Sequence, residues 1–360
     1  MKLYHSQNNR YLLALLFSSI FLFSFTAIAK PTKHTTKSTT ITKIDEVMNK
    51  ILQENTYPGI SLAIFLNGQT YHHSQHGLIN IEQQKSANQD TQFRMYSVTK
   101  GLTMLLAAIL VEHELLDVNA PIGQYLPNLP EDKKRLTAQQ LIDHRSGIRH
   151  YQGMGEWVAL MQQHCENPND AIKHFINDPL IDKPGKNEHY SSFAYVLLSA
   201  VMEASSGLTM NTLMEKYLFN KSQVERISFD DPTQLAQGDN TSLFYEPVND
   251  LQKIAPAADN SCKFGAGNIN ASPFAISKIF SAFNEGKLSS MKTVEQLFPK
   301  ASAIDKTSAK ASFGGEGLGG RSILHVYPNE NLVIVIAANA RGGNLQPYAN
   351  ELAEIILSQN

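Results

Sequence analysis

Residues 93–116 read FRMYSVTKGLTMLLAAILVEHELL, a polar start followed by a long apolar run. From Gly101 onward the run holds no proline and is rich in leucine and alanine, which predicts a buried helix. Ser97 stands where this helix begins and Lys100 follows three positions later, so their side chains can meet on one face. A serine hydroxyl is a weak nucleophile at neutral pH and needs an adjacent base. The stretch therefore predicts Ser97 as a nucleophile and Lys100 as the base that activates it, at a helix start that favours an oxyanion.

The same Ser-x-x-Lys spacing occurs a second time in the chain, at Ser289 and Lys292. The second copy lies in a polar stretch after Gly286 with no long apolar helix behind it, which predicts a loop or the start of a surface helix. By itself Ser97 could also be an ordinary helix N-cap. The local pattern alone therefore leaves the role of Ser97 open.

Apolar periodicity predicts similar sets of elements at the two ends of the chain. The N-terminal set is a helix over 44–52, a strand over 60–66, a type I′ turn at Asn67-Gly68 and a strand over 69–75. The C-terminal set is a pair of strands over 322–327 and 332–338 and a last helix with Leu352, Ile355 and Ile356 on one face. We therefore expect an α+β fold in which both termini build one antiparallel sheet flanked by helices. The expected domain covers 41–360, with its α/β part at about 41–95 and 300–360 and an inserted, mostly helical part at about 96–299, and the junction between the parts is a natural cleft.

The N-terminus predicts export. Lys2 and Arg10 precede an apolar run from Tyr11 to Ile28 that closes on an Ala-x-Ala site, which is the order of parts in a secretory signal peptide over 1–29. A retained membrane anchor is the alternative, because the run is of borderline length for spanning. The Thr-rich residues 30–40 predict a flexible leader. We expect a periplasmic or secreted protein without membrane contact after signal cleavage.

Composition limits the classes of partner that we expect for this protein. The chain has 360 residues, 42% of them hydrophobic and 18% charged, and a net charge of -2, so it can bury a sizeable core and gives no reason to expect nucleic acid as a partner. Cys165 and Cys262 could form a disulfide in an oxidising compartment, or remain two buried thiols, and the sequence leaves both open.

Histidines gather in two places without predicting a metal site. His72, His73 and His76 lie on one expected strand, where only the first and last share a face, and no carboxylate completes a ligand set. His144 and His150 flank a loop and are interpreted as structural. We expect no metal and no cofactor.

Three segments carry a family resemblance. Residues 93–130, residues 136–151 (LTAQQLIDHRSGIRHY) and residues 184–207 (PGKNEHYSSFAYVLLSAVMEASSG) resemble the class C β-lactamase-related superfamily, which includes penicillin-binding proteins and family VIII esterases. Residues 141–151 and 259–263 are most similar to the mitochondrial serine β-lactamase-like group and its bacterial relatives. The resemblance implies a β-lactamase/transpeptidase-like fold and acyl transfer through Ser97.

The second family motif, Tyr-x-Asn, corresponds to Tyr190-Ser191-Ser192. The resemblance implies that Tyr190 shares a proton with Lys100 and Ser97, first as general base and then as general acid. Ser192 replaces the family asparagine, and its hydroxyl can still hydrogen-bond the lysine or a substrate carbonyl.

The third family motif, Lys/His-Thr/Ser-Gly, corresponds to Phe313-Gly314-Gly315. In the family this cation recognises a substrate carboxylate, a role that Phe313 cannot fill, and an aromatic-Gly-Gly version resembles the esterase branch. The glycines let the backbone approach closely, and an N–H near Glu316 is expected to bind the oxyanion. Lys310 and Arg321 are candidates to restore the missing charge.

The leading hypothesis is a secreted serine hydrolase that acts on small-molecule or peptide esters and amides. Within it, carboxylesterase and peptidase are both open, and strong β-lactamase activity is the weaker branch. The alternative, from another class, is a catalytically weak or inactive relative that serves as a binding or scaffold protein. Ser97, Lys100 and Tyr190 favour catalysis, whereas Phe313 and Ser192 leave room for its loss.

Overall fold

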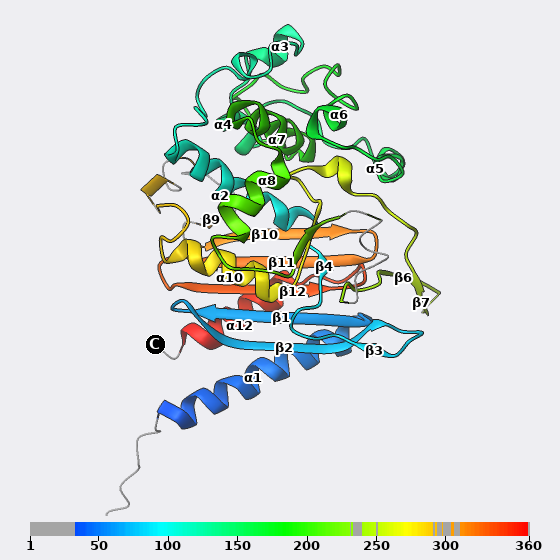
Figure 1. The fold of residues 1–360 in the computed structure, drawn as a ribbon. Helices are drawn as coiled ribbons and strands as arrows, with labels where there is room; N and C mark the ends of the chain where they lie inside the picture. The colour runs from blue at the N-terminus through cyan, green and yellow to red at the C-terminus, as the bar shows by residue number, and fades with distance from the viewer. Residues whose placement is uncertain are drawn as a thin grey trace, which may run out of the picture.

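The computed structural model describes residues 33–230, 232, 240–249, 251–290, 292, 293, 297, 304, 305 and 310–358. The expected signal peptide therefore lies outside the described residues. Figure 1 shows the two parts of the molecule, a sheet with helices against it and a helical part stacked on one end of that arrangement.

The main sheet is built from both ends of the chain, as predicted. Its seven strands run in the order β3-β2-β1-β12-β11-β10-β9, and the paired strands are antiparallel. Their bounds are Gly59–Leu66 (β1), Gln69–Asn80 (β2), Lys85–Ser86 (β3), Ile304–Asp305 (β9), Lys310–Gly317 (β10), Gly320–Tyr327 (β11) and Leu332–Ala338 (β12). Asn67 and Gly68 both have positive φ, 52° and 76°, which confirms the type I′ turn between β1 and β2.

Alternation along the central strands divides the core into two layers. On β12, Val333, Val335 and Ala337 pack toward the helical part, while Leu332, Ile334 and Ile336 pack toward α1 (Lys33–Glu54) and α12 (Gln346–Leu357). Successive side chains of a strand point to opposite faces, so one strand serves both layers. Helices α1 and α12 lie together on the outer face (Figure 1).

Helix α10 (Pro273–Asn284) corrects the expected boundary of the helical part. It lies within the range 96–299 that was assigned to that part, yet it packs on β1 and β12, and Ser277 donates a hydrogen bond to the carbonyl of Ala63 at 3.3 Å. A sheet that is apolar on both faces needs cover on both, and α10 supplies the second cover. Periodicity identifies such a helix but not the surface on which it packs.

The expected flexible leader is also corrected. Helix α1 begins at Lys33, so most of residues 30–40 continue the predicted helix toward the N-terminus. Thr40 is fully buried, and the Thr42 hydroxyl donates to the carbonyl of Ser38 at 3.2 Å within the helix. Threonine has a modest helix propensity, and here packing and internal hydrogen bonds outweigh it.

The remaining elements form the helical part and two small sheets. The helices are α2 (Thr99–Glu112), α3 (Glu131–Lys134), α4 (Ala138–Ile142), α5 (Met154–Leu160), α6 (Pro168–Ile172), α7 (Ser192–Ser206) and α8 (Met210–Met214), with short turns η1 (Tyr96–Val98), η2 (Ile122–Gln124), η3 (Glu215–Phe219) and η4 (Ser261–Lys263). The small sheets join β4 (Phe93–Arg94), β8 (Ile269–Ala271) and β5 (Ile227–Phe229), and β6 (Tyr245–Val248) with β7 (Leu251–Ile254). Among the described helices none alone has the length and apolar character to cross a membrane, while Ser192–Ser206 and Met210–Phe219 meet the criterion only as a pair bent by 80°.

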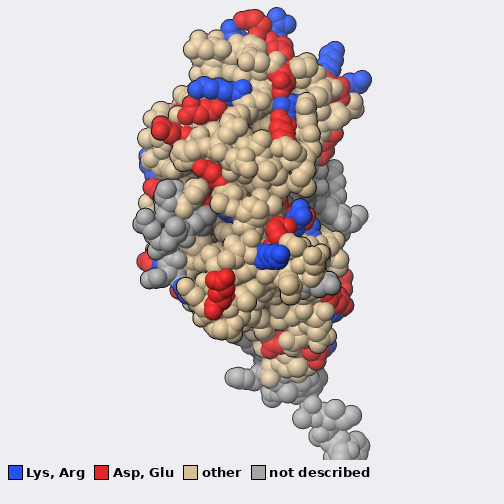
Figure 2. Space-filling view, turned by 90° about the vertical axis from the view of Figure 1, so that its right-hand side faces the viewer, with Lys and Arg blue, Asp and Glu red and all other residues tan. Residues whose placement is uncertain are grey.

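The face of the molecule in Figure 2 carries acidic and basic side chains in small mixed groups among uncharged ones. This distribution is consistent with the small net charge of -2.

Cys165 and Cys262, 97 positions apart, form a disulfide, which resolves the alternative that the sequence left open.

Candidate active site

Ser97 lies in the 3-10 turn η1, which leads directly into the buried helix α2. Ser97 is not a helix N-cap. The N-cap of η1 is Met95 and that of α2 is Val98, and neither makes a side-chain cap bond. Tyr96 before Ser97 has a positive φ of 43°, a strained conformation for a side chain other than glycine. Its buried ring and its hydroxyl, which donates to the Leu318 carbonyl, hold that conformation. The sharp turn leaves the Ser97 hydroxyl free to face the cleft.

Ser97, Lys100 and Tyr190 form one hydrogen-bonded cluster. The Lys100 ammonium donates to the Ser97 hydroxyl at 2.9 Å, and the hydroxyls of Ser97 and Tyr190 lie 2.8 Å apart. The structure thus brings together the three residues predicted to carry catalysis, although Tyr190 is 93 positions from Ser97.

Lys100 is buried and uses its donors fully. Besides Ser97, it donates to the Ser192 hydroxyl at 3.1 Å and to the Ala266 carbonyl at 2.8 Å. An ammonium group has three protons, so these three acceptors account for all of them. The Ser192 hydroxyl therefore makes the contact to the lysine that its position in the second motif predicted.

The environment of Tyr190 favours its ionised form. About half of the residue is exposed, 49%, but its hydroxyl is turned inward to Ser97. Burial of the phenol raises its pKa, but the charge of Lys100 and hydrogen bonds with Lys100, Ser97 and Ser192 outweigh this effect. The pKa of Tyr190 is consequently lowered from its ordinary value, as a proton acceptor requires.

Two histidines hold the tyrosine segment in place. The Nδ1 atoms of His144 and His150 accept hydrogen bonds from the backbone N–H groups of Ser191 and Ser192, at 3.1 and 3.2 Å. Their rings lie 4.7 and 5.2 Å from the Tyr190 ring, centroid to centroid. Burial and then the charge of Lys100 lower the pKa of His144 to about 3 and that of His150 to about 4, so both are neutral at pH 7. Both histidines have the structural role that the sequence predicted, but they pack against the site itself. The sequence feature that pointed to this position is that both lie in residues 136–151, which carry the family resemblance.

Strand β10 closes the other side of Ser97. A Cβ built on Gly315 would lie 3.1 Å from the Ser97 nitrogen and 2.5 Å from the Ser322 hydroxyl. The predicted close approach of this strand is therefore confirmed at Gly315. Glu316 follows on the cleft side, and its carboxylate pairs with Arg321.

Phe313 lies beside helix α2, next to Gly101. It lines a cavity of about 210 Å³ together with Ser97, Lys100, Tyr190 and Gly314. Lys310 and Arg321, the two candidates to replace the missing cation, do not line this cavity: Lys310 donates to Asn350 at 2.6 Å and Arg321 pairs with Glu316. The possibility that one of them restores the charge at Phe313 gains no support from these contacts, since other partners hold both side chains.

A second and larger cavity, about 580 Å³, meets the first at Ser97 and Tyr190. Its walls include Trp157, Lys263, Gly267 and Arg341. Lys263 lies in the segment 259–263 that carries part of the family resemblance, but no site role was predicted for it from the sequence. The second Ser-x-x-Lys copy is elsewhere: Ser289 is buried and Lys292 is exposed. It cannot form the same cluster.

The fold and this cluster are those of the serine β-lactamase and penicillin-binding-protein class of hydrolases. The family model described as Beta-lactamase matches residues 44–357, and the chain belongs to this family. The resemblance inferred from the sequence is thereby confirmed.

Individual relatives are distant. The mitochondrial serine beta-lactamase-like protein LACTB of Homo sapiens is 26% identical over 290 residues, covering 62% of this chain and 52% of the relative, so the chain spans about half of that protein. The teichoic acid D-alanine hydrolase of Staphylococcus aureus is 24% identical over 330 residues, covering 87% of this chain and 78% of the relative. The structure of the octameric penicillin-binding protein homologue from Pyrococcus abyssi aligns with a TM-score of 0.74 at 17% identity, covering 89% of this chain and 78% of that chain, which shows a common fold.

Proposed function

We propose that this protein is an exported hydrolase that cleaves esters, small amides or peptides through an acyl-enzyme on Ser97. The observation that carries the proposal is the cluster in which the Ser97 hydroxyl contacts both Lys100 and Tyr190. A nucleophile, a proton acceptor and a fixed cation within hydrogen-bond reach are the parts that nucleophilic catalysis needs.

The contacts suggest a proton path. Lys100 already donates to three acceptors, so we assign the immediate base to the Tyr190 oxygen, as the resemblance implies, and not to Lys100, the base that the Ser-x-x-Lys spacing predicted. Ser97 attacks the substrate carbonyl carbon as its proton passes to Tyr190, and a tetrahedral oxyanion forms. The backbone N–H groups of Ser97 and Glu316 are the donors that we expect to bind that oxyanion. Tyr190 then gives the proton to the leaving group as its bond to carbon breaks, and water releases the acyl group by the same steps.

Substrate choice follows from Phe313. Penicillins carry a carboxylate close to the scissile bond, and a charge-assisted hydrogen bond to such a group contributes about 1.5–3 kcal/mol. Phe313 offers no such bond and adds a desolvation cost. Short esters without that carboxylate are therefore the favoured substrates, and the name of the Staphylococcus aureus relative, a hydrolase of teichoic acid D-alanine, fits ester chemistry.

Export is part of the proposal. The signal-like N-terminus supports it, and the disulfide between Cys165 and Cys262 fits an oxidising compartment. N-terminal sequencing of the mature protein should begin at Lys30. A soluble cytoplasmic protein that retains Met1 would contradict this part.

A fluorophosphonate probe tests the catalytic proposal directly. The probe should label the purified protein at Ser97, as located by peptide mapping. Ser97→Ala should abolish labelling, while Ser289→Ala, which removes the serine of the other Ser-x-x-Lys copy, should not. Absence of labelling in the wild-type protein, or labelling that survives Ser97→Ala, would overturn the proposal and favour a binding or scaffold role.

A further inference from the structure

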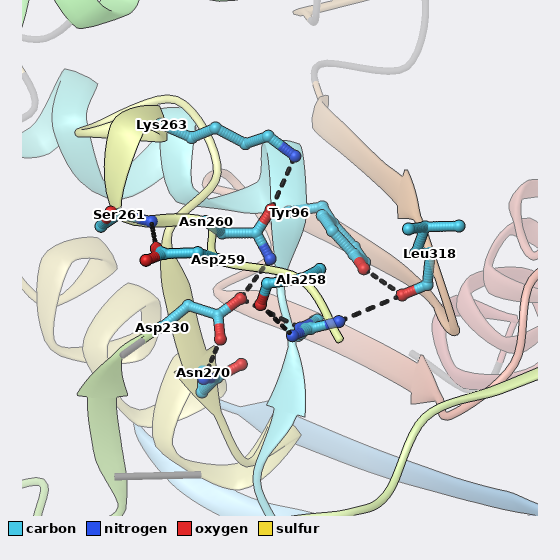
Figure 3. A network of polar contacts seen from close by, with 10 residues as sticks. Tyr96, Asp230, Ala258, Asp259, Asn260, Ser261, Lys263, Asn270 and Leu318 are labelled. Atoms are coloured by element: carbon cyan, nitrogen blue, oxygen red, sulfur yellow. Dashed lines mark hydrogen bonds and ion pairs between the residues drawn. The ribbon is translucent and has the colours of Figure 1, made fainter. Parts of the chain in front are cut away.

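The larger cavity contains a buried lysine that the proposed acyl transfer does not use. Lys263 ends the turn η4, is only 4% exposed and lines the cavity with Ser97 and Tyr190. Its ammonium donates to the Asn260 side-chain oxygen at 2.6 Å and lies 5.1 Å from the centroid of the Trp157 ring. Figure 3 shows this lysine at the end of a polar network that runs to Leu318.

That network does not neutralise Lys263. The carboxylate of Asp230 accepts from Arg94 Nε at 3.0 Å and, through the same oxygen, from Asn260. Its other oxygen accepts from Asn270 at 3.1 Å (Figure 3). Arg94 thus takes up the charge of Asp230, and Lys263 reaches that carboxylate only through the neutral amide of Asn260. The hydrogen-bonded chain from Lys263 through Asn260 and Asp230 to Arg94 holds two cations and one anion.

The other charged groups around the cavity are already paired. Arg341 lies 3.3 Å from Glu246, and Arg321 pairs with Glu316. Lys263 and Arg341 are the cations among the described lining residues of this cavity, and Lys263 is the one without a carboxylate partner and with donors to spare. Lys100 lines the smaller cavity and uses all three of its protons. A buried charge left uncompensated is costly, so such a group is a candidate for function.

We propose that the Lys263 ammonium binds a carboxylate of the substrate in the larger cavity. The inference rests on the proposed hydrolase function and deepens it. The ammonium has three protons, of which the bond to Asn260 uses one, so two can bind a ligand. One uncompensated positive charge matches one monoanionic group, which favours a carboxylate over a dianionic phosphate. The substrate would then carry its carboxylate on the half opposite to Phe313.

Two pairs of esters test the assignment without assuming which half enters the cavity. The first pair is the 4-nitrophenyl monoester of adipate and 4-nitrophenyl hexanoate, which differ by a carboxylate on the acyl half. The second is 3-carboxyphenyl butanoate and its 3-carbamoyl counterpart, which differ on the leaving half. The readout is the ratio of kcat/KM for the anionic ester to kcat/KM for the neutral ester. The neutral member corrects for any general loss of activity.

Lys263→Met should lower this ratio by on the order of tenfold or more in the pair whose carboxylate enters the larger cavity. Lys263→Arg keeps the charge and should retain part of the preference. Lys310→Met removes a cation that lies outside the cavity and should leave both ratios unchanged. Ratios in Lys263→Met that equal those of the wild type in both pairs would overturn the inference.

The pH dependence of the wild-type ratio is a second test that needs no variant. Burial lowers the pKa of Lys263 to about 7; Asp230 raises it, and Arg94 and Lys100 lower it. Lys263 is charged below that pKa, so the preference for the anionic ester should be present below about pH 7 and lost above it. Effects on the catalytic cluster cancel in the ratio. A ratio that does not change between pH 5.5 and pH 9 in both pairs would contradict the inference. Failure of the proposed function looks different: the wild type would then cleave neither neutral ester and take no probe at Ser97.

Discussion

The closeness of β10 to the nucleophile makes Gly315→Ala a sharp test of the site. A methyl group at this position would lie 2.5 Å from the Ser322 hydroxyl, and the Met95 carbonyl oxygen would be closer still. Real Cβ contacts are essentially never shorter than 3.0 Å, so the strand and the Met95 carbonyl in the turn before Ser97 must separate by more than about 0.5 Å. Both are backbone elements of the expected oxyanion site, and neither can rotate away as a flexible side chain does.

The expected loss follows from that displacement. A misplacement of about 1 Å can cost on the order of 100-fold in rate, and removal of one oxyanion donor costs about 100- to 1,000-fold. We therefore expect kcat/KM for 4-nitrophenyl butanoate to fall about 100-fold in Gly315→Ala, which corresponds to about 2.7 kcal/mol. Thermal unfolding measured alongside would show whether the variant remains folded.

The neighbouring glycine supplies a matched control. A Cβ on Gly314 meets only the Ile323 side chain, at an ordinary distance of 3.8 Å. Gly314→Ala adds the same methyl group to the same strand without a short contact, so it should lower kcat/KM much less than Gly315→Ala does, even though Gly314 lines the smaller cavity. The reasoning would be refuted if Gly315→Ala is folded and fully active, or if both variants lose activity equally.

Three further outcomes follow from the structure. Replacing Cys165 and Cys262 with serine should lower the midpoint of thermal unfolding, because a disulfide across a loop this long stabilises typically by about 2–4 kcal/mol; an unchanged midpoint would contradict this. Phe313→Lys should raise nitrocefin turnover relative to 4-nitrophenyl butanoate by roughly one order of magnitude, and efficient wild-type nitrocefin hydrolysis left unchanged by the substitution would show that the cation is not needed. His144 and His150 have folded-state pKa values below the ordinary 6.5, so the unfolded chain binds more protons than the folded one below that pH. The free energy of unfolding should therefore fall as the pH drops from 6.5 toward 4. A free energy of unfolding that stays constant over this range in chemical denaturation would speak against their burial as neutral rings.

Local sequence patterns predicted those features of the fold and the site that depend on residues close together in the chain. Ser97 and Lys100 are three positions apart at a helix start, so a spacing rule was enough to bring them together. The hairpin at Asn67-Gly68 is of the same kind, because its turn residues determine the backbone conformation. Tyr190 lies too far along the chain for any such rule, and only the family resemblance assigned it.

Lys263 shows why the rest of the site could not be predicted. Residues 259–263 carry part of the family resemblance, but no spacing rule in that segment indicates that Lys263 is buried or lines the site. Its burial and its partnership with Asn260 depend on how distant segments pack, and the lack of a carboxylate partner depends on Arg94 having taken Asp230. Helix α10 was assigned to the wrong part for the same reason, since periodicity does not say which surface a helix covers.

The segment that carries Lys263 also contacts Lys100, and this joins the proposed carboxylate site to the proposed catalytic cluster. The Lys263 carbonyl accepts the backbone N–H groups of Ala266 and Gly267, both at 2.9 Å, and the Ala266 carbonyl in turn accepts from Lys100. The disulfide anchors the residue next to Lys263, Cys262, to the helical part. One short turn therefore fixes the proposed carboxylate-binding cation and one of the three acceptors of the Lys100 ammonium. A substrate carboxylate bound to Lys263 would contact the same turn that positions Lys100, so the proposed recognition and the proposed reaction share one structural element.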